Sequence, residues 1–273
     1  MTELIIKPKR TLNFRSDLQE IWQYRELLYF LAWRDLKVRY KQTAIGVLWA
    51  VFQPFTTMVV FTIFFGNLAK MPSDGIPYPI FVYTGLLLWQ FFSTALADAS
   101  DSLTRNQAIL TKVYFPRIFL PLSSIIVGVV DFLISTVILI GMMFYYGYAP
   151  NLAGLLLLPL LLFISMMAAL GLGLFLSAVN LKYRDVRYVL PFFIQLMMFV
   201  TPVIYPASIA GKYAKLLALN PMTGVISAAR AALLGNAVIN WPLLAISGGA
   251  CLVLLVIGIL YFKKSEKYFA DVV

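Results

Sequence analysis

Four basic side chains stand together just before the first long apolar stretch of the chain, at Arg34, Lys37, Arg39 and Lys41. Charges of this kind suit the anionic headgroups of a membrane surface, where each one contributes about 1 kcal/mol of attraction. Two interpretations stay open. Either the run binds a ligand, or it serves only to orient the neighbouring apolar segment in a membrane.

A single carboxylate, Asp131, stands near the middle of another long apolar stretch. An acid inside a membrane span is a candidate proton relay, because its charge is costly to bury in lipid. The alternatives are a hydrogen bond to a nearby hydroxyl, such as that of Ser135, or a place in a water-filled lumen. The sequence offers no buried basic partner for Asp131, which disfavours proton coupling. If Asp131→Asn leaves transport unchanged, the relay role is excluded.

The sequence lacks the motifs of the common enzyme classes. It has no histidine and one cysteine, Cys251, so neither a disulfide within the chain nor an ordinary metal site is expected. There is no GxxxxGK[ST] loop, so this chain cannot itself be an ATPase, and HExxH and GxSxG are also missing. We therefore expect no catalytic residue and no cofactor in this chain, which should move a substrate rather than transform it.

Membrane-spanning helices must position these residues. The 273 residues are 61% hydrophobic and have a mean hydropathy of +0.85, which is typical of an integral membrane protein. The fold class is predicted to be all-α, a polytopic membrane protein with six transmembrane helices. The six apolar segments that suit a hydrocarbon core of about 30 Å are 46–65, 80–97, 116–144, 152–179, 188–204 and 241–262.

The flanking regions have their own predicted roles. Residues 1–45 are expected to form a cytoplasmic tail and an amphipathic interface helix, because Ser16 and Gln19 have the spacing of a capping box and an apolar face follows. Residues 46–262 form the transmembrane domain, and 263–273 a cytoplasmic C-terminus. Within that domain, 206–240 holds short helical pieces that are expected to be re-entrant or interfacial.

A polar segment, Ser100–Arg117, separates the second and third spans. Its charges exclude it from lipid, since each would cost about 2.5–3.5 kcal/mol at the bilayer centre. Its apolar residues recur at helical spacing, which predicts a short surface helix over about 100–115. The positive-inside rule places this segment and both termini in the cytoplasm. Few of the 22 Lys and Arg residues lie on the opposite side, namely Lys70, Lys212, Lys215 and Arg230.

Aromatic residues are more numerous than two interfacial belts require, with 21 Phe, 15 Tyr and 5 Trp. Several could line a conduit, because aromatic rings stack on the apolar faces of sugars and carry no fixed charge. For any single ring, contact with lipid or packing in the core is the alternative. The candidates for channel lining are Trp49, Phe52, Phe55, Tyr83, Trp89, Phe91, Phe92 and Tyr205.

Several stretches of the chain resemble one known family, in the same order along the sequence. They are WRDLKVRYKQTAIGVLWAVFQP (33–54), KVYFPRIFLPLS (112–123), NLKYRDV (180–186), TPVIYP (201–206) and LNPMTGVISAAR (219–230). The chain is similar to the type-2 ABC-transporter permeases that export polysaccharides, and the likeness covers nearly everything past Leu27.

The resemblance implies a homodimer in the bacterial inner membrane, among membrane lipids, paired with two copies of a separate ATPase. ATP and Mg would belong to that partner, and no nucleic acid is expected. The substrate would be a polyprenyl-linked polysaccharide, most simply an O antigen, with capsule and teichoic acid as the other choices. ATP-driven closure of the ATPases would then shift the helices on either side of the polar segment.

The resemblance also implies roles for particular residues. The polar segment corresponds to a coupling helix seated on the ATPase, and Ala108→Pro should uncouple ATP hydrolysis from export. Its candidate contacts are Asp101, Leu103, Arg105, Asn106, Gln107 and Lys112. Guanidinium groups pair well with phosphate oxygens, so a pyrophosphate of the carrier could meet Arg34, Lys37, Arg39, Lys41, Arg184 and Arg187.

Two rival functions remain. One is an ABC permease of the same type that exports a drug or a lipid. The other is an ion-coupled carrier that needs no partner. Purification separates the carrier from the permeases, because a carrier would be active without any ATPase.

Overall fold

The computed structural model describes residues 14–41, 46–110, 112, 114–149, 152–183, 185–213, 217–235 and 238–269. Throughout these ranges the chain is helical or irregular and contains no strand, so the predicted all-α class is confirmed. The helices are α1 (Phe14–Gln23), α2 (Arg25–Lys41), α3 (Leu48–Phe61), α4 (Tyr78–Arg105), α5 (Gln107–Leu110), α6 (Phe119–Tyr145), α7 (Leu152–Lys182), α8 (Val186–Val200), α10 (Pro221–Leu234) and α11 (Trp241–Ser265). A π-helical turn, Thr62–Leu68, extends α3, and 3₁₀ turns cover Ala207–Tyr213 and Glu266–Tyr268.

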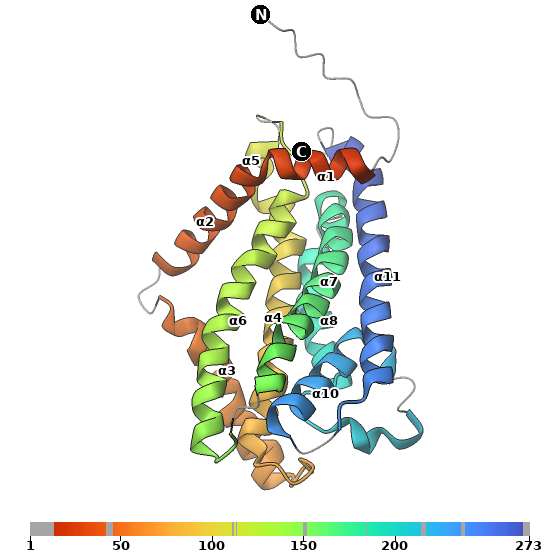
Figure 1. The fold of residues 1–273 in the computed structure, drawn as a ribbon. Coiled ribbons are helices and arrows are strands. Elements are labelled where there is room, and N and C mark those ends of the chain that lie inside the picture. The colour runs from red at the N-terminus through yellow and green to blue at the C-terminus, as the bar shows by residue number, and fades with distance from the viewer. Residues whose placement is uncertain are drawn as a thin grey trace, which may run out of the picture.

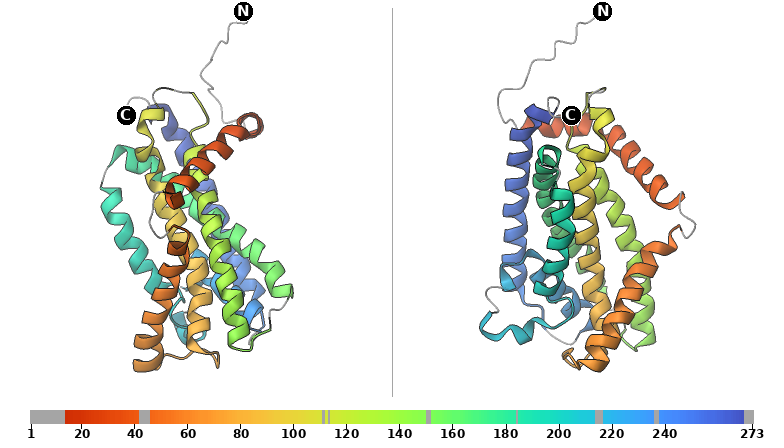
Figure 2. Two further views of the ribbon diagram at one scale, coloured as in Figure 1. Left: turned by 90° about the vertical axis from the view of Figure 1, so that its left-hand side faces the viewer. Right: turned by 180° about the vertical axis from the view of Figure 1, so that it is seen from behind.

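The long helices run between two ends of a bundle (Figure 1). At the α5 end, α4 stops, α6 starts, and α7 and α11 finish. At the α10 end, α4 and α11 start and α6 finishes. α4 packs against both α6 and α7, and α7 packs against α11. α1 lies across the α5 end, and α2 slants from it toward the start of α3 (Figures 1 and 2).

Five helices in the described ranges are long and apolar enough to cross a membrane, at 48–68, 78–105, 119–145, 154–182 and 241–265. They correspond to five of the six predicted spans. The remaining predicted span, 188–204, corresponds to α8, whose 15 residues extend only about 22 Å at 1.5 Å per residue. α8 nevertheless runs alongside the bundle from the α5 end toward the α10 end (Figure 2). A total of six crossings therefore stays a prediction that depends on α8.

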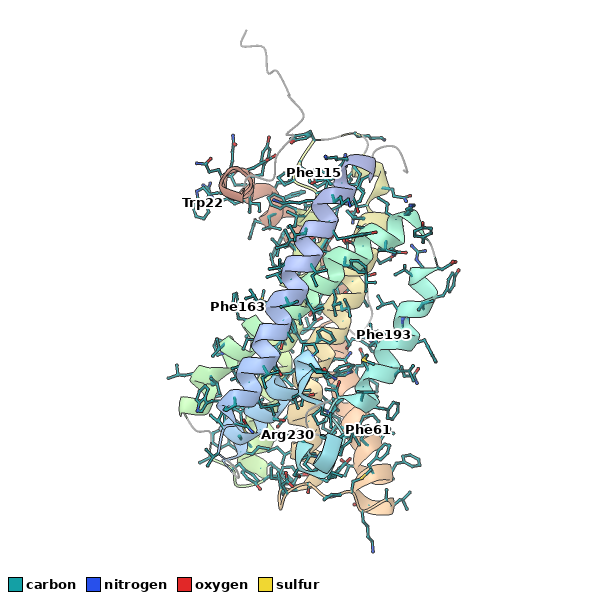
Figure 3. The ribbon with its side chains drawn as sticks, turned by 90° about the vertical axis from the view of Figure 1, so that its right-hand side faces the viewer. Trp22, Phe61, Phe115, Phe163, Phe193 and Arg230 are labelled. Atoms are coloured by element: carbon teal, nitrogen blue, oxygen red, sulfur yellow. The ribbon has the colours of Figure 1, made fainter. Side chains whose placement is uncertain are left out.

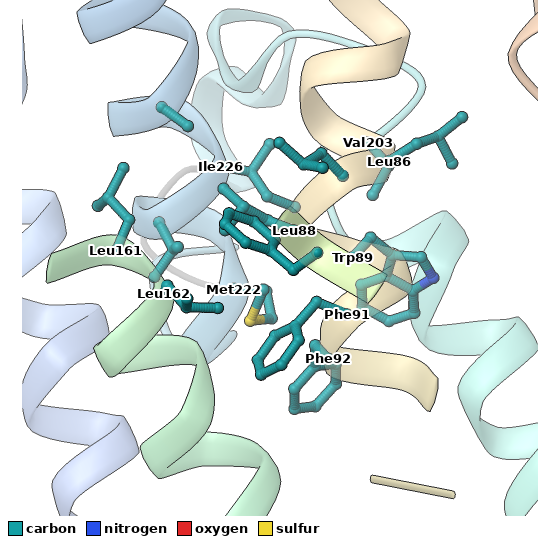
Figure 4. Close-up of a cluster of buried hydrophobic side chains, with 14 of the residues drawn as sticks. Leu86, Leu88, Trp89, Phe91, Phe92, Leu161, Leu162, Val203, Met222 and Ile226 are labelled. Atoms are coloured by element: carbon teal, nitrogen blue, oxygen red, sulfur yellow. The ribbon is translucent and has the colours of Figure 1, made fainter. Parts of the chain in front are cut away.

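The central helix of the bundle is α4. In its apolar 18-residue stretch, 78% is buried inside the chain, against only 11% in the corresponding stretch of α3. The largest hydrophobic cluster forms around it with side chains from α6, α7 and α10 (Figure 4). A second cluster fills the α5 end. It joins side chains from α2, α4, α5, α6, α7 and α11, namely Leu31, Leu103, Leu110, Phe115, Phe119, Leu120, Leu174, Ala178, Leu181, Phe262 and Phe269.

Two glycines let α7 contact neighbouring helices at backbone distance. A Cβ on Gly258 of α11 would lie 2.0 Å from the carbonyl oxygen of Gly171, and a Cβ on Gly173 would lie 2.7 Å from the Cβ of Ala99 on α4. Small residues such as Gly171 and Gly173 permit this close approach of helices. The helices α4, α7 and α11 are thereby held closely together.

Local signals explain where the short helices begin and end. Asn220 caps α10, because its Oδ1 accepts a hydrogen bond from the backbone N–H of Met222 at 3.0 Å, and Pro221 occupies the first helical position. α10 ends at Gly235, which has a φ of 65° that a side chain would disfavour. α10 and the 3₁₀ turn before it match the two short helical pieces expected between 206 and 240.

The N-terminal helix lies within the predicted range 1–45, but it breaks at Tyr24, and its second part, α2, continues to Lys41, so the basic run lies on that helix. One predicted boundary is wrong. The surface helix expected over 100–115 does not exist as one unit, because residues 100–105 continue α4 and α5 has only four residues. Within the polar segment, packing of Leu103 against the second cluster extends the membrane helix beyond its apolar stretch.

Candidate functional site

The polar segment turns sharply at Asn106. Its backbone leaves the helical conformation, and its side-chain Nδ2 donates to the carbonyl oxygen of Ser102 at 2.8 Å. Its own carbonyl oxygen then accepts hydrogen bonds from the backbone N–H groups of Ile109 and Leu110, at 3.0 and 3.3 Å. Asn106 thus closes α4 and opens the single turn of α5, which is the part of the polar segment that projects from the bundle.

The polar segment has an inner and an outer side. Leu103 and Leu110 point inward and are buried in the second cluster, so Leu103 cannot reach an ATPase as proposed. The side chains of Arg105 and Lys112 are exposed, while Asn106 and Gln107 are half-buried. Figure 3 labels Phe115, which anchors the segment that leads back to α6.

In this structure, Ala108→Pro is a weak test of whether α5 couples ATP hydrolysis to export. Ala108 is the second residue of a one-turn helix. Proline disrupts a helix mainly from its interior, and a helix of a single turn has almost no interior to disrupt. Ala108 is exposed, so a large side chain at this position is a better probe of what binds against α5.

A network of ion pairs starts at the polar segment and crosses between helices. Asp101, a proposed ATPase contact on α4, pairs instead with Arg187 of α8 at 3.0 Å and with Arg105 at 3.3 Å. Arg105 also pairs with Asp98 at 3.1 Å, and Asp98 lies 3.4 Å from the guanidinium of Arg39 on α2. The polar segment is therefore linked electrostatically to α2 and to α8.

The same network reaches the acid of the third span. Arg39 forms an ion pair of 2.9 Å with Asp131, and the hydroxyl of Tyr40 donates a hydrogen bond to that carboxylate. The expectation that Asp131 lacks a basic partner is thus wrong. Ser135 does not bond to Asp131 but to the carbonyl oxygen of Ala50 on α3, at 3.1 Å. Burial, followed by the bond to Asp131, raises the pKa of the Tyr40 phenol, so Tyr40 stays a proton donor.

The first basic residue of the run is held in a similar way. Arg34 donates to the carboxylate of Asp35 at 2.7 Å and to the side-chain oxygen of Asn106 at 2.9 Å. The other oxygen of Asp35 accepts a hydrogen bond from Ser123 on α6 at 3.1 Å. These contacts fix α2 directly to the turn between α4 and α5.

Five of the six candidate phosphate contacts therefore divide into two groups. The guanidinium groups of Arg34, Arg39 and Arg187 all pair with carboxylates of this chain. The ammonium groups of Lys37 and Lys41 belong to exposed residues on α2, and that of Lys37 lies 5.3 Å from the ring centre of Trp33. Arg184 lies outside the described residues.

The aromatic residues proposed to line a channel differ in their exposure. Tyr83, Trp89, Phe91 and Phe92 on α4 are buried in the main cluster of this chain, so the alternative of core packing fits them better (Figure 4). On α3, by contrast, the rings are exposed. They include Trp49 and Phe52, which stack with a centroid distance of 5.7 Å, and Phe55. Tyr205 is half-buried, and its hydroxyl donates to the carbonyl oxygens of Phe199 and Val200.

A cavity of about 330 Å³ lies beside the network, between the end of α2, the start of α3, α4 and α6. Most of its wall is apolar, and charged, amide and hydroxyl side chains interrupt that apolar surface. Its lining includes Arg39, Trp49, Gln53, Gln90, Phe91, Thr94 and Asp131.

The α10 end contains a charged residue whose role the sequence did not reveal. Arg230 is buried on α10, and its guanidinium donates to the carbonyl oxygens of Phe81, Pro202 and Val203 at 3.2, 2.7 and 2.6 Å (Figure 3). It also stacks 3.6 Å from the ring centre of Phe81. Sequence reasoning counted Arg230 only as a charge on the outer side, because its acceptors are backbone groups that leave no pattern.

No group of three or more acidic, cysteine or histidine side chains is placed to hold a metal ion in the described part of the chain. Around α5, exposed side chains are linked by packing and charge to the membrane helices.

Comparisons with known proteins agree along most of the chain. Residues 26–234 match the model of the family described as ABC-2 type transporter. The O-antigen export system permease protein RfbA of Klebsiella pneumoniae is 29% identical over 248 residues, which cover 90% of this chain and 95% of that protein. The protein of the same name from Myxococcus xanthus is 33% identical over 218 residues, covering 78% and 82%. The polysialic acid transport protein KpsM of Escherichia coli is 23% identical over 239 residues, covering 86% and 91%.

Proposed function

Because this chain belongs to the ABC-2 type transporter family, we propose that it is the membrane-spanning permease subunit of an ATP-driven exporter of lipid-linked O antigen. The observation that carries this proposal is the identity of 29–33% to two O-antigen export permeases over most of both chains. The identity to a polysialic acid transport protein is lower, at 23%. An O antigen is therefore favoured over a capsule, and a teichoic acid has no relative in its support.

The permease works as two copies joined to two copies of a separate ATPase, which holds the ATP and Mg. It resides in the bacterial inner membrane with the α5 end and both termini in the cytoplasm, as the distribution of Lys and Arg favours. Only 11% of the apolar stretch of α3 is buried within a single chain, which is consistent with a second copy packing against this helix.

The coupling segment receives the motion of the ATPase. α5 is too short to act as an independent lever, but Leu103, Leu110 and Phe115 embed the segment in the second hydrophobic cluster. A push on α5 therefore displaces the ends of α2, α4, α6, α7 and α11 together, since packed interiors transmit strain. The ion pairs of Asp101 and Asp98 extend this unit to α8 and α2.

The carrier's phosphates are met at the membrane surface by Lys37 and Lys41, whose residues are exposed on α2. The arginines of the run contribute less to this contact, because carboxylates of the chain already neutralise them. Asp131 serves as the partner of Arg39 rather than as a proton relay, which removes the main argument for an ion-coupled carrier.

Deletion of the gene tests the function. We expect O antigen to disappear from the cell surface while its lipid-linked form accumulates inside, with recovery when the chain is supplied again. Continued display of O antigen would contradict the proposal, and a defect confined to drug resistance or lipid content would favour the rival ABC permease.

Docking of the ATPase is tested at Ala108. Ala108→Trp places a large side chain on the exposed surface of α5 and should abolish co-purification of the ATPase without lowering the amount of permease in the membrane. Ala245→Trp is the matched control, because Ala245 is exposed on α11 within the apolar span. Equal recovery of ATPase with both variants would show that α5 is not the docking surface.

A further inference from the structure

The cavity between α2, α3, α4 and α6 is a candidate ligand site that the network of ion pairs does not explain. Its volume of about 330 Å³ lies at the lower end of the range of roughly 300–1,000 Å³ that is typical of ligand pockets. Such a space suits a small part of a long substrate rather than a whole molecule. Its wall is built from four helices, so the cavity is shaped by the fold and not by one mobile loop.

The charge of the cavity excludes a phosphate as its occupant. Arg39 is the cation of the wall, but its guanidinium lies 2.9 Å from Asp131 and 3.4 Å from Asp98. A diphosphate would have to displace these carboxylates and would be repelled by Asp131, which itself lines the cavity. The wall is therefore balanced in charge and suits an uncharged ligand.

The amide and hydroxyl side chains that interrupt the apolar wall favour a ligand that carries hydroxyl groups. The amides of Gln53 and Gln90 and the hydroxyl of Thr94 each offer both donors and acceptors, and Gln90 already donates to Thr94 at 3.3 Å. A sugar hydroxyl likewise donates and accepts. The ring of Trp49, which is exposed, supplies a flat apolar surface in the same wall, against which the C–H face of a sugar ring fits.

We propose that this cavity binds a sugar unit of the exported glycan, while the carrier's phosphates stay outside it. The inference rests on the proposed function, because it takes the substrate to be a glycan. It assigns the recognition of sugar to side chains of α3 and α4, and it separates that recognition from the lysines of α2. The glycan subsite thus lies next to Arg39 and Asp131, the residues that link it to the coupling network.

The test measures binding of the glycan without its carrier. Polysaccharide is released from the lipid by mild acid in the strain that encodes the chain, labelled at its new reducing end, and titrated against the full-length chain in lipid nanodiscs. Gln90→Leu removes one amide at nearly constant volume and should weaken binding about fivefold. Gln195→Leu, at an exposed position of α8 away from the cavity, should leave the affinity unchanged. Inorganic pyrophosphate should not compete with the glycan.

Equal affinity of the unaltered chain and Gln90→Leu would overturn the proposal, as would competition by pyrophosphate or a lack of glycan binding. If Gln90→Leu does not fold, Thr94→Val removes a hydroxyl without changing the shape and is expected to weaken binding in the same direction. The deletion strain separates the two proposals. Persistent surface O antigen refutes the function, whereas lost display together with unaltered binding refutes only the sugar site.

Discussion

The two ends of the bundle hold their cations in different ways. At the α10 end, Arg230 is buried and bonds to backbone carbonyl groups. Toward the α5 end, Arg39, Arg105 and Arg187 are part-exposed and pair with carboxylates, which lie on another helix for Arg39 and Arg187 and on the same helix for Arg105. A carbonyl moves only with its backbone, while a carboxylate on a flexible side chain can exchange partners. The difference suggests an α10 end built to keep its shape and an α5 end built to change it.

The expected energies follow from this contrast. Removing a buried cation leaves several carbonyl groups without donors, and each unsatisfied buried group costs about 1–3 kcal/mol. Ion pairs that water can reach contribute about 0–1 kcal/mol each. Substitutions should therefore lower the free energy of unfolding most at the α10 end and least at the exposed side chains of the α5 end.

The largest effect is expected for Arg230→Ala. It removes the donors to the carbonyl groups of Pro202 and Val203 and leaves a void beside Phe81, so unfolding should become easier by about 3–5 kcal/mol. Thermal unfolding of the purified chain measures the change. Arg25→Ala is the control, because Arg25 is exposed on α2. A loss no larger than that of the control would mean that the α10 end is not held by Arg230.

A second substitution, on α4, disturbs the surroundings of Arg230. A Cβ on Gly85 would lie 2.6 Å from Nη2 of Arg230 and 3.2 Å from the carbonyl oxygen of Val203. We expect Gly85→Ala to destabilise the chain by about 1–3 kcal/mol through overpacking. Gly141→Ala on α6 meets nothing within 4 Å and should not destabilise it. Similar melting temperatures for the two variants would show that Arg230 can move aside.

An intermediate effect is expected within the network. A double-mutant cycle with Arg39→Ala and Asp131→Asn should give a coupling energy of about 1 kcal/mol, because the paired side chains are 31% and 22% exposed. Chemical unfolding of the four proteins measures it. Export by Asp131→Asn is assayed in parallel, and retained export would exclude a proton relay. A coupling energy near zero would break the proposed link between α2 and α6.

The smallest effect on stability is expected for Arg105→Ala at the rim. Its side chain is 49% exposed, so the loss of its pairs with Asp98 and Asp101 should cost no more than about 0.5 kcal/mol. Salt should abolish even this difference, since it screens exposed charges. Melting curves at low and high ionic strength provide the measurement. A loss above 1 kcal/mol that persists in salt would make the two ends alike.

Much of the fold follows from patterns that act locally. Length and apolarity locate the long spans, and Gly171 and Gly173 predict a close helix approach, because these signals need no knowledge of distant residues. The break at Asn106 was not predictable, since helical spacing continues through it and burial of Leu103 decides how far α4 extends.

The polar contacts of the candidate site were the least predictable part. Tyr40 bonds to Asp131 across 91 positions of sequence, and Arg230 bonds to carbonyl groups that any residue would carry. Neither contact produces a residue spacing or a composition from which it could be predicted. Conversely, the abundance of aromatic residues suggested channel lining on α4, where the structure shows packing in the core.

The C-terminal turn gives the coupling segment an unexpected neighbour. Arg117 donates to the carbonyl oxygen of Glu266 at 2.5 Å and lies over the ring of Phe269, which is buried in the second cluster. The coupling segment is therefore not a loop that can be transplanted alone. A chimaera that exchanges it between related permeases must carry four separate pieces of chain, residues 14–41, 100–120, 174–181 and 262–269, if the grafted unit is to retain its own packing.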